Sequence, residues 1–155
     1  MTRADQLEID TGVAIAASPA LVWSILTDFV SYPSWNRYMV CVEGRAQAGA
    51  MLRVTTRDAA SRHETTQQIH VAAAAPYFMR WIGGADAPDV FRAAHRFELI
   101  PTADGRTVLR HAERFSGSAA GAIMQEYGVA LRSNFRLFNR CLKEAAERRA
   151  SAVQA

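Results

Sequence analysis

Hydrophobic and polar residues alternate along most of this chain, which predicts strands that each bury one face. The first alternating stretch runs from Leu7 to Ile15. Six more follow, at about 39–46, 51–58, 62–75, 77–83, 90–101 and 106–117, and turn-forming Gly, Ala, Asp and Pro residues separate them. Because short connections join antiparallel neighbours, we expect these six stretches to form an antiparallel meander.

Two short helices are predicted between the first strand and the second. Ser18 and Pro19 are typical of an N-cap and a first helical residue, and apolar residues follow at helical spacing to about residue 27. The next stretch, Asp28–Asn36, combines aromatic side chains with a proline. We expect Pro33 to break the helix there, because its ring removes a backbone donor. The side chains expected to close this narrow end of the fold are Phe29 and Trp35.

A different period begins near residue 119. Apolar residues recur at steps of three and four, at Ile123, Tyr127, Leu131, Phe135, Phe138 and Leu142. This spacing predicts one long amphipathic helix that ends near residue 149, with a frayed tail over 151–155. The order of elements predicts an α+β fold, in which a seven-stranded, curved antiparallel sheet wraps around the long C-terminal helix in a single domain over 1–150.

A cavity is expected between this sheet and this helix. One helix is only about 10–12 Å wide, whereas a curved sheet of seven strands is much wider. Part of the concave face therefore has no helix against it, and that space is filled either by side chains or by a ligand.

Composition excludes several functional classes. Half of the 155 residues are hydrophobic and 21% are charged, which is typical of a globular chain, and no apolar run is long enough to span a membrane. The polar N-terminus lacks the features of a signal peptide. Cys41 and Cys141 form no metal-binding motif. We therefore expect a cytoplasmic protein, monomeric or homodimeric, with two buried thiols.

The net charge of +3 is carried in good part by the long predicted helix. Arg132, Arg136 and Arg140 are four residues apart and so lie on one stripe of it. A solvated helix face is the first interpretation, and contact with RNA, the ribosome or an anionic membrane is the second. Aromatic residues are not interleaved with the stripe as base stacking requires, and no DNA partner is expected.

The last predicted hairpin carries the most informative polar residues. Alternation places His95 and Phe97 on the apolar face of strand 90–101, and His111 and Glu113 on the apolar face of strand 106–117. The short loop Thr102–Arg106 then sets His95 opposite Glu113 and Phe97 opposite His111, provided that no bulge shifts the register. By the same argument, the inward residues of strand 62–75 are Thr65, Gln67, Ile69, Val71 and Ala73.

Three interpretations fit an interior face that carries His95, His111 and Glu113. A buried carboxylate is costly unless it is paired, so the first is a structural His–Glu bond that anchors the hairpin. The second is a polar handle that orients a ligand in an apolar pocket. The third is general acid–base catalysis by His95 and Glu113, because imidazole titrates near neutral pH. No metal site is expected, because no second cluster of ligands supports one.

Two longer blocks carry a resemblance to a known superfamily. They are SPALVWSILTDFVSYPSWN after the first strand and HRFELIP…GRTVLRHAERFSG before the last helix. The chain resembles the START-like (SRPBCC, Bet v 1-like) superfamily, and within it the small bacterial polyketide cyclase/dehydrase-type members. The resemblance implies a helix-grip fold. It leaves the activity open, because members include ligand carriers, cyclases and ribosome-associated factors.

The main functional prediction is a protein that encloses a small hydrophobic or aromatic molecule between sheet and helix, with no cofactor. The residues expected to line that site are Trp35, Tyr38, Val54, Gln67, Ile69, Met79, Trp81, His95, Phe97, His111, Glu113, Tyr127, Leu131 and Phe135. One alternative is a cyclase, aromatase or dehydratase that uses His95 and Glu113 as acid–base groups. The other is an interaction protein that contacts RNA or a membrane through the basic helix.

Overall fold

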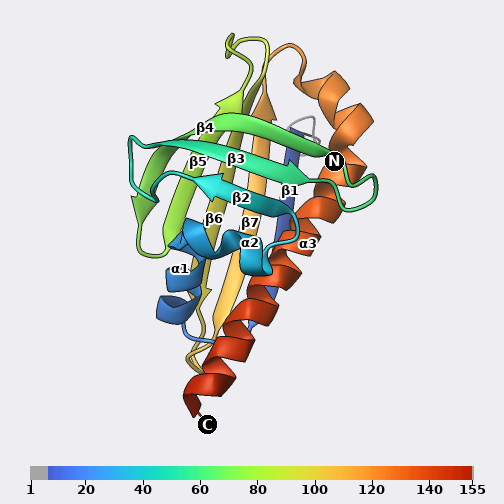
Figure 1. Ribbon diagram of the computed structural model, residues 1–155. Helices are drawn as coiled ribbons and strands as arrows, with labels where there is room; N and C mark the ends of the chain where they lie inside the picture. Colours follow the sequence, from blue (N-terminus) through green and yellow to red (C-terminus); the bar gives the residue numbers. More distant parts are fainter. Residues whose placement is uncertain (1–6, 155) are drawn as a thin grey trace.

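The structure is a computed structural model that describes residues 7–154. In chain order its elements are β1 Glu8–Ile15, α1 Pro19–Thr27, the 3₁₀ turn η2 Phe29–Ser31, α2 Tyr32–Trp35, β2 Met39–Glu43, β3 Met51–Arg57, β4 Glu64–Ala75, β5 Phe78–Gly84, β6 Arg92–Pro101, β7 Thr107–Ser116 and α3 Ala120–Gln154. This order is the one that the sequence predicts, and Figure 1 shows the strands crossed by the single long helix.

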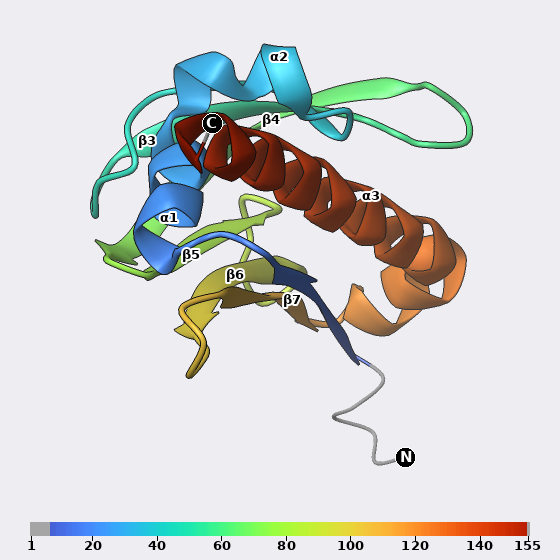
Figure 2. The same cartoon turned by 90° about the horizontal axis from the view of Figure 1, so that it is seen from below.

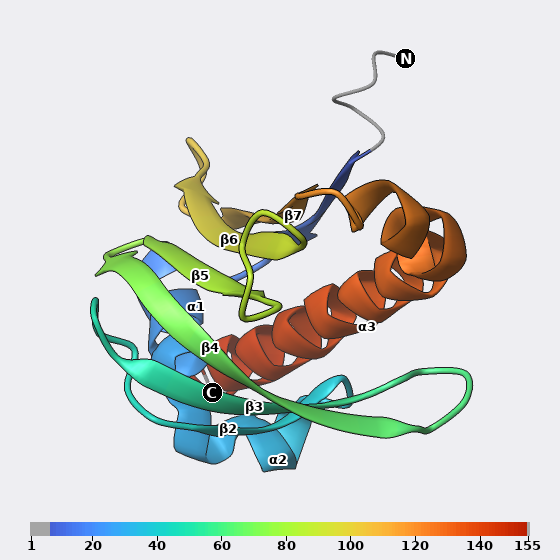
Figure 3. The same cartoon turned by 90° about the horizontal axis from the view of Figure 1, so that it is seen from above.

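The seven strands form one antiparallel sheet in the order β1-β7-β6-β5-β4-β3-β2. Strands β2 to β7 are a meander, and β1 pairs with β7 at the edge where the meander ends. Figures 2 and 3 show that the sheet curves around α3, with β2–β4 on one side of the helix and β5–β7 on the other. The predicted α+β helix-grip fold is therefore confirmed.

Helix α1 begins where the sequence predicts. The Ser18 hydroxyl accepts a hydrogen bond from the Leu21 backbone N–H at 3.2 Å, and Pro19 occupies the first turn, where its missing donor costs nothing. The helix turns its apolar face to the core, and the buried residues are Val22, Ile25 and Leu26.

The segment after α1 differs from the prediction in one respect. Pro33 does not end a helix; it lies in the first turn of α2, a position where proline is tolerated. The segment is anchored by the Tyr32 hydroxyl, which donates to the Leu26 carbonyl at 2.6 Å. Phe29 packs edge-on against Trp81, and the centroids of Trp35 and Phe138 are 6.0 Å apart, so this end of the sheet is closed by aromatic contacts.

Helix α3 is longer than predicted, because it continues through Ser151–Gln154, which we expected to be frayed. At about 1.5 Å per residue it is roughly 52 Å long. One basic side chain of the helix outside the arginine stripe is paired: Lys143 contacts Glu147 at 2.6 Å and donates to the Ala14 carbonyl at 2.9 Å. Among the described residues, no helix is long and apolar enough to cross a membrane.

A bulge in β4 changes the side of the sheet on which Ala73 lies, and the prediction that Ala73 faces inward is wrong. The pairing of β4 with β5 runs from Val71 opposite Trp81 to Ala73 opposite Arg80, so one residue of β4 is skipped. Because the side-chain period of a strand is two, the skip reverses the faces that follow. Ala73 therefore lies on the outer face, and Ala74 packs against the core in its place.

Candidate functional site

A cavity of about 580 Å³ lies between the concave face of the sheet and the first half of α3. Its wall is predominantly apolar, and its size is within the range of small-molecule sites. The apolar lining residues are Met39, Val54, Ile69, Trp81, Gly83, Gly84, Phe91, Ala93, Phe115, Ile123, Ala130 and Leu131. The residues with polar or titratable groups are Tyr38, Thr56, Asp58, Ser61, His63, Thr65, Gln67, His95, Glu113, Tyr127 and Asn134.

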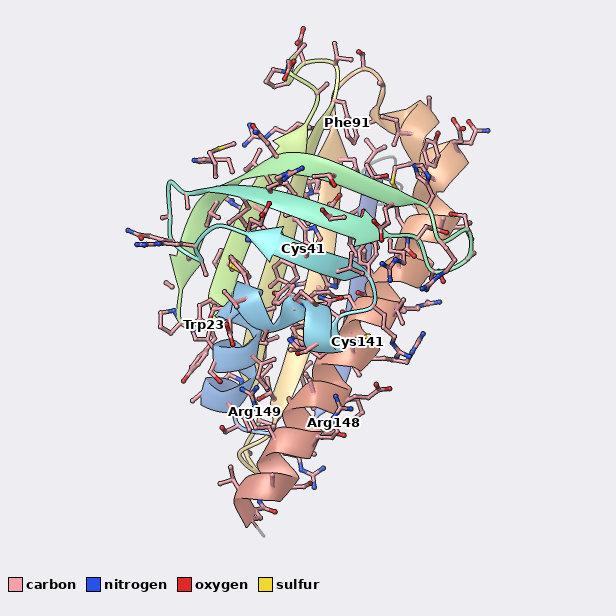
Figure 4. The ribbon with its side chains drawn as sticks, in the orientation of Figure 1. Trp23, Cys41, Phe91, Cys141, Arg148 and Arg149 are labelled. Atoms are coloured by element: carbon pink, nitrogen blue, oxygen red, sulfur yellow. The ribbon has the colours of Figure 1, made fainter. Side chains whose placement is uncertain are left out.

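Small residues on the sheet explain why the cavity lies at this end of it. Gly83 and Ala93 are paired across β5 and β6, and both line the cavity. A Cβ added at Gly83 would come within ordinary contact of Ile69, 3.6 Å from its Cγ1, so the position has room for a side chain that the sequence does not supply. Phe91, labelled in Figure 4, lies at this end beside the start of α3, whereas Trp23 lies on α1 toward the opposite end.

The β3–β4 hairpin forms the rim of the cavity and is clamped to α3. The Asn134 amide accepts from the Ala59 backbone N–H at 2.9 Å and donates to the Asp58 carboxylate at 3.0 Å. Hydrogen bonds from the Ser61 backbone first, and from Asn134 second, lower the pKa of Asp58 to about 2. Beyond this clamp Thr65 and Gln67 line the cavity and are exposed, so the cavity opens to solvent here.

Two lining residues form the polar centre of the site. His95 pairs with Glu113 across β6 and β7, as predicted, and the His95 Nδ1 to Glu113 Oε2 distance is 2.5 Å. Their side chains are only 8% and 13% exposed, so the contact is largely shielded from water. A hydrogen-bonded ion pair or a neutral acid–base pair is the arrangement that makes such burial tolerable.

His111 lies behind this pair and is wholly buried. Its Nε2 is 2.5 Å from Nε2 of His95, and its Nδ1 is 2.7 Å from Oδ1 of Asn139. Burial first, and the neighbouring His95 second, hold the pKa of His111 well below its usual value, against the opposite effect of hydrogen bonds to Asn139 and the Phe135 backbone. Phe97 and Phe135 each lie nearly parallel to both imidazoles, so the rings are held in apolar surroundings.

The structure separates the predicted site residues into two groups. Nine of the fourteen line the cavity: Tyr38, Val54, Gln67, Ile69, Trp81, His95, Glu113, Tyr127 and Leu131. The other five are not part of its wall: Trp35, Met79, Phe97, His111 and Phe135. Four of these five are buried in the core, and Trp35 is partly buried against it. The reason is that side chains of the second half of α3 and of the sheet pack against one another and fill the space there.

Sequence reasoning did not single out Asn139 as a partner of the buried histidines. The signal was present, because Asn139 follows Phe135 by four residues and precedes Leu142 by three, which places an amide on the apolar stripe of α3. A polar side chain on such a stripe needs a hydrogen-bond partner, and here the partners are His111 and Thr11. Within residues 7–154, no three His, Cys, Asp or Glu side chains converge to hold a metal ion.

Solved structures with the same fold include polyketide-pathway proteins and proteins of unknown function. The di-domain aromatase/cyclase StfQ from the steffimycin biosynthetic pathway has a TM-score of 0.71 and 12% identity over 96% of this chain, which spans only 53% of that protein. Protein SA2116 of unknown function, from Staphylococcus aureus, has a TM-score of 0.68 and 15% identity over 96% of each chain.

The Zhui aromatase/cyclase from Streptomyces sp. R1128 has a TM-score of 0.70 and 20% identity, covering 92% of this chain and 94% of its own. Identities this low establish the fold alone. No curated protein matches the chain in sequence. The sequence profile of one family does match, over residues 6–147, which is nearly the whole chain. The chain therefore belongs to the family described as polyketide cyclase / dehydrase and lipid transport.

Proposed function

We propose that this protein binds a small hydrophobic or aromatic molecule in the cavity between the sheet and the first half of α3. The observation that carries the proposal is the cavity itself: about 580 Å³, with a mostly apolar wall and one buried polar pair. Apolar walls with a few placed polar groups are the usual design of small-molecule sites. Membership of a family that includes lipid transport supports the same conclusion.

The wall divides into parts with different expected roles. Ile69, Trp81 and Phe115 offer apolar contact along the sheet, and Leu131 offers it from α3. Such contact contributes affinity roughly in proportion to the apolar area removed from water. The His95–Glu113 pair is the polar group that would orient the ligand, because a ligand hydroxyl or carbonyl could hydrogen-bond to it in surroundings that are otherwise apolar and largely shielded from water.

Filling the cavity tests this proposal. Adjacent residues of β6 provide a matched pair: Ala93 faces the cavity, whereas Ala94 pairs with Ile82 and Arg114 on the outer face. We expect Ala93→Phe to weaken the binding of an apolar fluorescent probe by about tenfold or more, equivalent to about 1.4 kcal/mol, and Ala94→Phe to bind as the parent does. Fluorescence titration measures both. Equal affinity in the two variants, or no binding by the parent, would overturn the proposal.

A second candidate is an enzyme in which His95 and Glu113 transfer protons to and from the bound molecule. The specific observation is their 2.5 Å contact at the cavity wall, with both side chains nearly shielded from water. His95→Gln and Glu113→Gln, made separately, distinguish the two functions with any poly-keto compound that the protein is found to convert. Loss of turnover with retained affinity would assign the proton transfer to the pair, and loss of affinity with retained turnover would show that the pair orients the molecule and does not transfer the proton.

A further inference from the structure

A continuous chain of hydrogen bonds leads from the cavity wall to the edge of the sheet. It begins at Glu113 and passes through His95 and His111, with 2.5 Å at each contact. It continues from His111 Nδ1 to Asn139 at 2.7 Å, and from the Asn139 amide to the Thr11 hydroxyl at 2.9 Å. The Thr11 hydroxyl ends the chain on the His111 carbonyl, at 2.8 Å.

The Thr11 end determines the direction of these bonds. A hydroxyl has one proton, and a backbone carbonyl can only accept, so Thr11 donates to His111 O. Thr11 therefore accepts from Asn139, and it is the NH₂ of the amide that faces it. The amide oxygen of Asn139 must then face His111, and it requires a donor there. Hence Nδ1 of His111 carries a proton.

The direction at Thr11 decides the tautomer of the next ring. His111 is wholly buried among Phe97 and Phe135, which opposes a charged imidazolium. A neutral ring with a proton on Nδ1 has a lone pair on Nε2, so the contact with His95 needs a donor from His95 Nε2. The geometry agrees: the ring planes differ by 18° and the centroids are 4.7 Å apart while the two nitrogens are 2.5 Å apart, so the rings meet edge to edge.

One proton is then left for the last contact. Because His95 uses Nε2 as a donor to His111, its Nδ1 either carries a second proton that is donated to the Glu113 carboxylate or accepts a proton from the neutral acid. In both arrangements a single proton is shared between His95 Nδ1 and Glu113 Oε2. Such a pair can give a proton to a ligand carbonyl or take one from a ligand hydroxyl without first exchanging with solvent.

We propose that Thr11, Asn139 and His111 are positioning residues that hold His95 in one hydrogen-bonding orientation and thereby confine one exchangeable proton to the His95–Glu113 contact at the cavity wall. The role of that proton toward a ligand rests on the proposed function, whereas the tautomers do not. The side chains packed around His95 are aromatic: Trp81, Phe97 and Phe135. The other titratable groups that face the cavity are Tyr38, Asp58, His63 and Tyr127.

Side-chain ¹⁵N NMR of the intact protein without ligand tests the assignment directly. We expect His111 to be protonated on Nδ1 and unprotonated on Nε2 across about pH 5 to 8. We also expect His95 Nε2 to stay protonated, while His95 Nδ1 and the Glu113 carboxyl report one shared proton. A His111 proton on Nε2, or an unprotonated His95 Nε2, would overturn the proposal, and this result depends on no variant.

A matched pair of threonine variants tests whether Thr11 controls the rings. Thr11→Val removes the hydroxyl that orients Asn139, so the amide can turn its NH₂ toward His111. We expect both histidines to change together, His111 toward a proton on Nε2 and His95 toward a proton on Nδ1. Thr107→Val removes a more deeply buried hydroxyl that donates to the Ala17 carbonyl, outside the chain of bonds, and should leave the histidine spectrum unchanged.

The two variants and the probe titration separate the possible failures. If Thr11→Val and Thr107→Val give the same histidine spectrum, Thr11 is not a positioning residue. If Thr11→Val does not fold, the spectrum of the parent protein still decides the tautomers. An empty cavity in the probe titration would overturn the proposed function and leave the NMR assignment as it stands.

Discussion

The two halves of α3 face the same sheet, yet they make different contacts with it. In the second half, residues 134–146, the buried side chains include Phe135, Phe138 and Leu142, and they rest on the sheet and on α1 and α2. In the first half, residues 121–133, no residue is fully buried, and Tyr127 is 51% exposed. In Figures 1 to 3 the first turns of α3 curve away from the line of the rest of the helix.

The sheet side chains opposite each half account for this difference. Large residues, among them Trp81 and Phe97, fill the space under the second half and are wholly buried. Gly83 lies two positions after Trp81 on β5, and Ala93 lies four positions before Phe97 on β6. These small residues leave the space under the first half empty. A cavity therefore needs no special element in this fold. It follows from where small residues replace large ones on the concave face.

Truncating one aromatic residue in each half should give the largest contrast. Phe138 is wholly buried against Tyr32, Trp35 and Phe97. We expect Phe138→Ala to lower the free energy of unfolding by about 3–5 kcal/mol, because it removes apolar contacts and leaves a void. Tyr127→Ala should change it by about 0.5 kcal/mol or less. Urea denaturation measures both, and comparable losses would contradict the division of α3 into a packed half and a half that covers the cavity.

Acid should destabilise the protein through His111, which lies on β7 under the packed half of α3. The pKa of this buried imidazole is held well below 6.5, so below that pH the unfolded chain binds a proton that the folded chain does not. Stability is therefore greatest above about pH 6.5 and falls as the pH drops, by up to about 1.4 kcal/mol per pH unit. In His111→Gln, the part of this pH dependence of the unfolding free energy that comes from His111 should be lost. An identical pH dependence of the unfolding free energy in the two proteins would show that His111 does not carry it.

A smaller effect is expected at the clamp that joins the β3–β4 hairpin to α3 at Asn134, where the two halves of the helix meet. Asn134→Ala removes two hydrogen bonds to the hairpin and should cost about 1 kcal/mol. It should also move the pKa of Asp58 from about 2 part of the way back toward 3.8. In the parent protein the stabilisation from this carboxylate is complete above about pH 4 and is lost as the pH falls toward 2.

Carboxyl NMR titration measures the pKa of Asp58 in the parent and in the variant. The exposed neighbour Ser133 provides the control, since Ser133→Ala should leave that pKa unchanged. If Asn134→Ala leaves it unchanged as well, the amide does not hold the carboxylate, and the rim of the cavity is held by the hairpin alone.

Much of the fold was predictable, because helix caps, helix and strand periods and hairpin register depend on residues close together in the sequence. The N-cap at Ser18 and the period change before α3 were both read correctly from single residues and spacings. The register of the last hairpin followed from strand alternation and the short loop, and it set His95 opposite Glu113. Pro33 and Ala73 were misjudged, because a tolerated proline in a first turn and a strand bulge leave little trace in residue type.

The division between cavity wall and packed core was not predictable in the same way. Phe97, His111 and Phe135 share the inward faces with the lining residues, and alternation alone assigned them all to one site. What separates them is whether side chains fill the space between helix and sheet at each level. That filling depends on the summed volumes of side chains from β5, β6 and α3, which no single element contains.

The sequence by itself determined the elements, their order, the antiparallel meander and the facing of His95 and Glu113, because strand and helix periods act over a few residues. Only the tertiary structure decided that α3 brings Asn139 to His111 and that Thr11 of β1 completes the chain of bonds. It also decided that one half of α3 covers a cavity, whereas the other half packs directly on the sheet. The two hydrogen bonds of Asn139 join residues 28 and 128 positions apart, and the helix must first rest on the sheet before they exist.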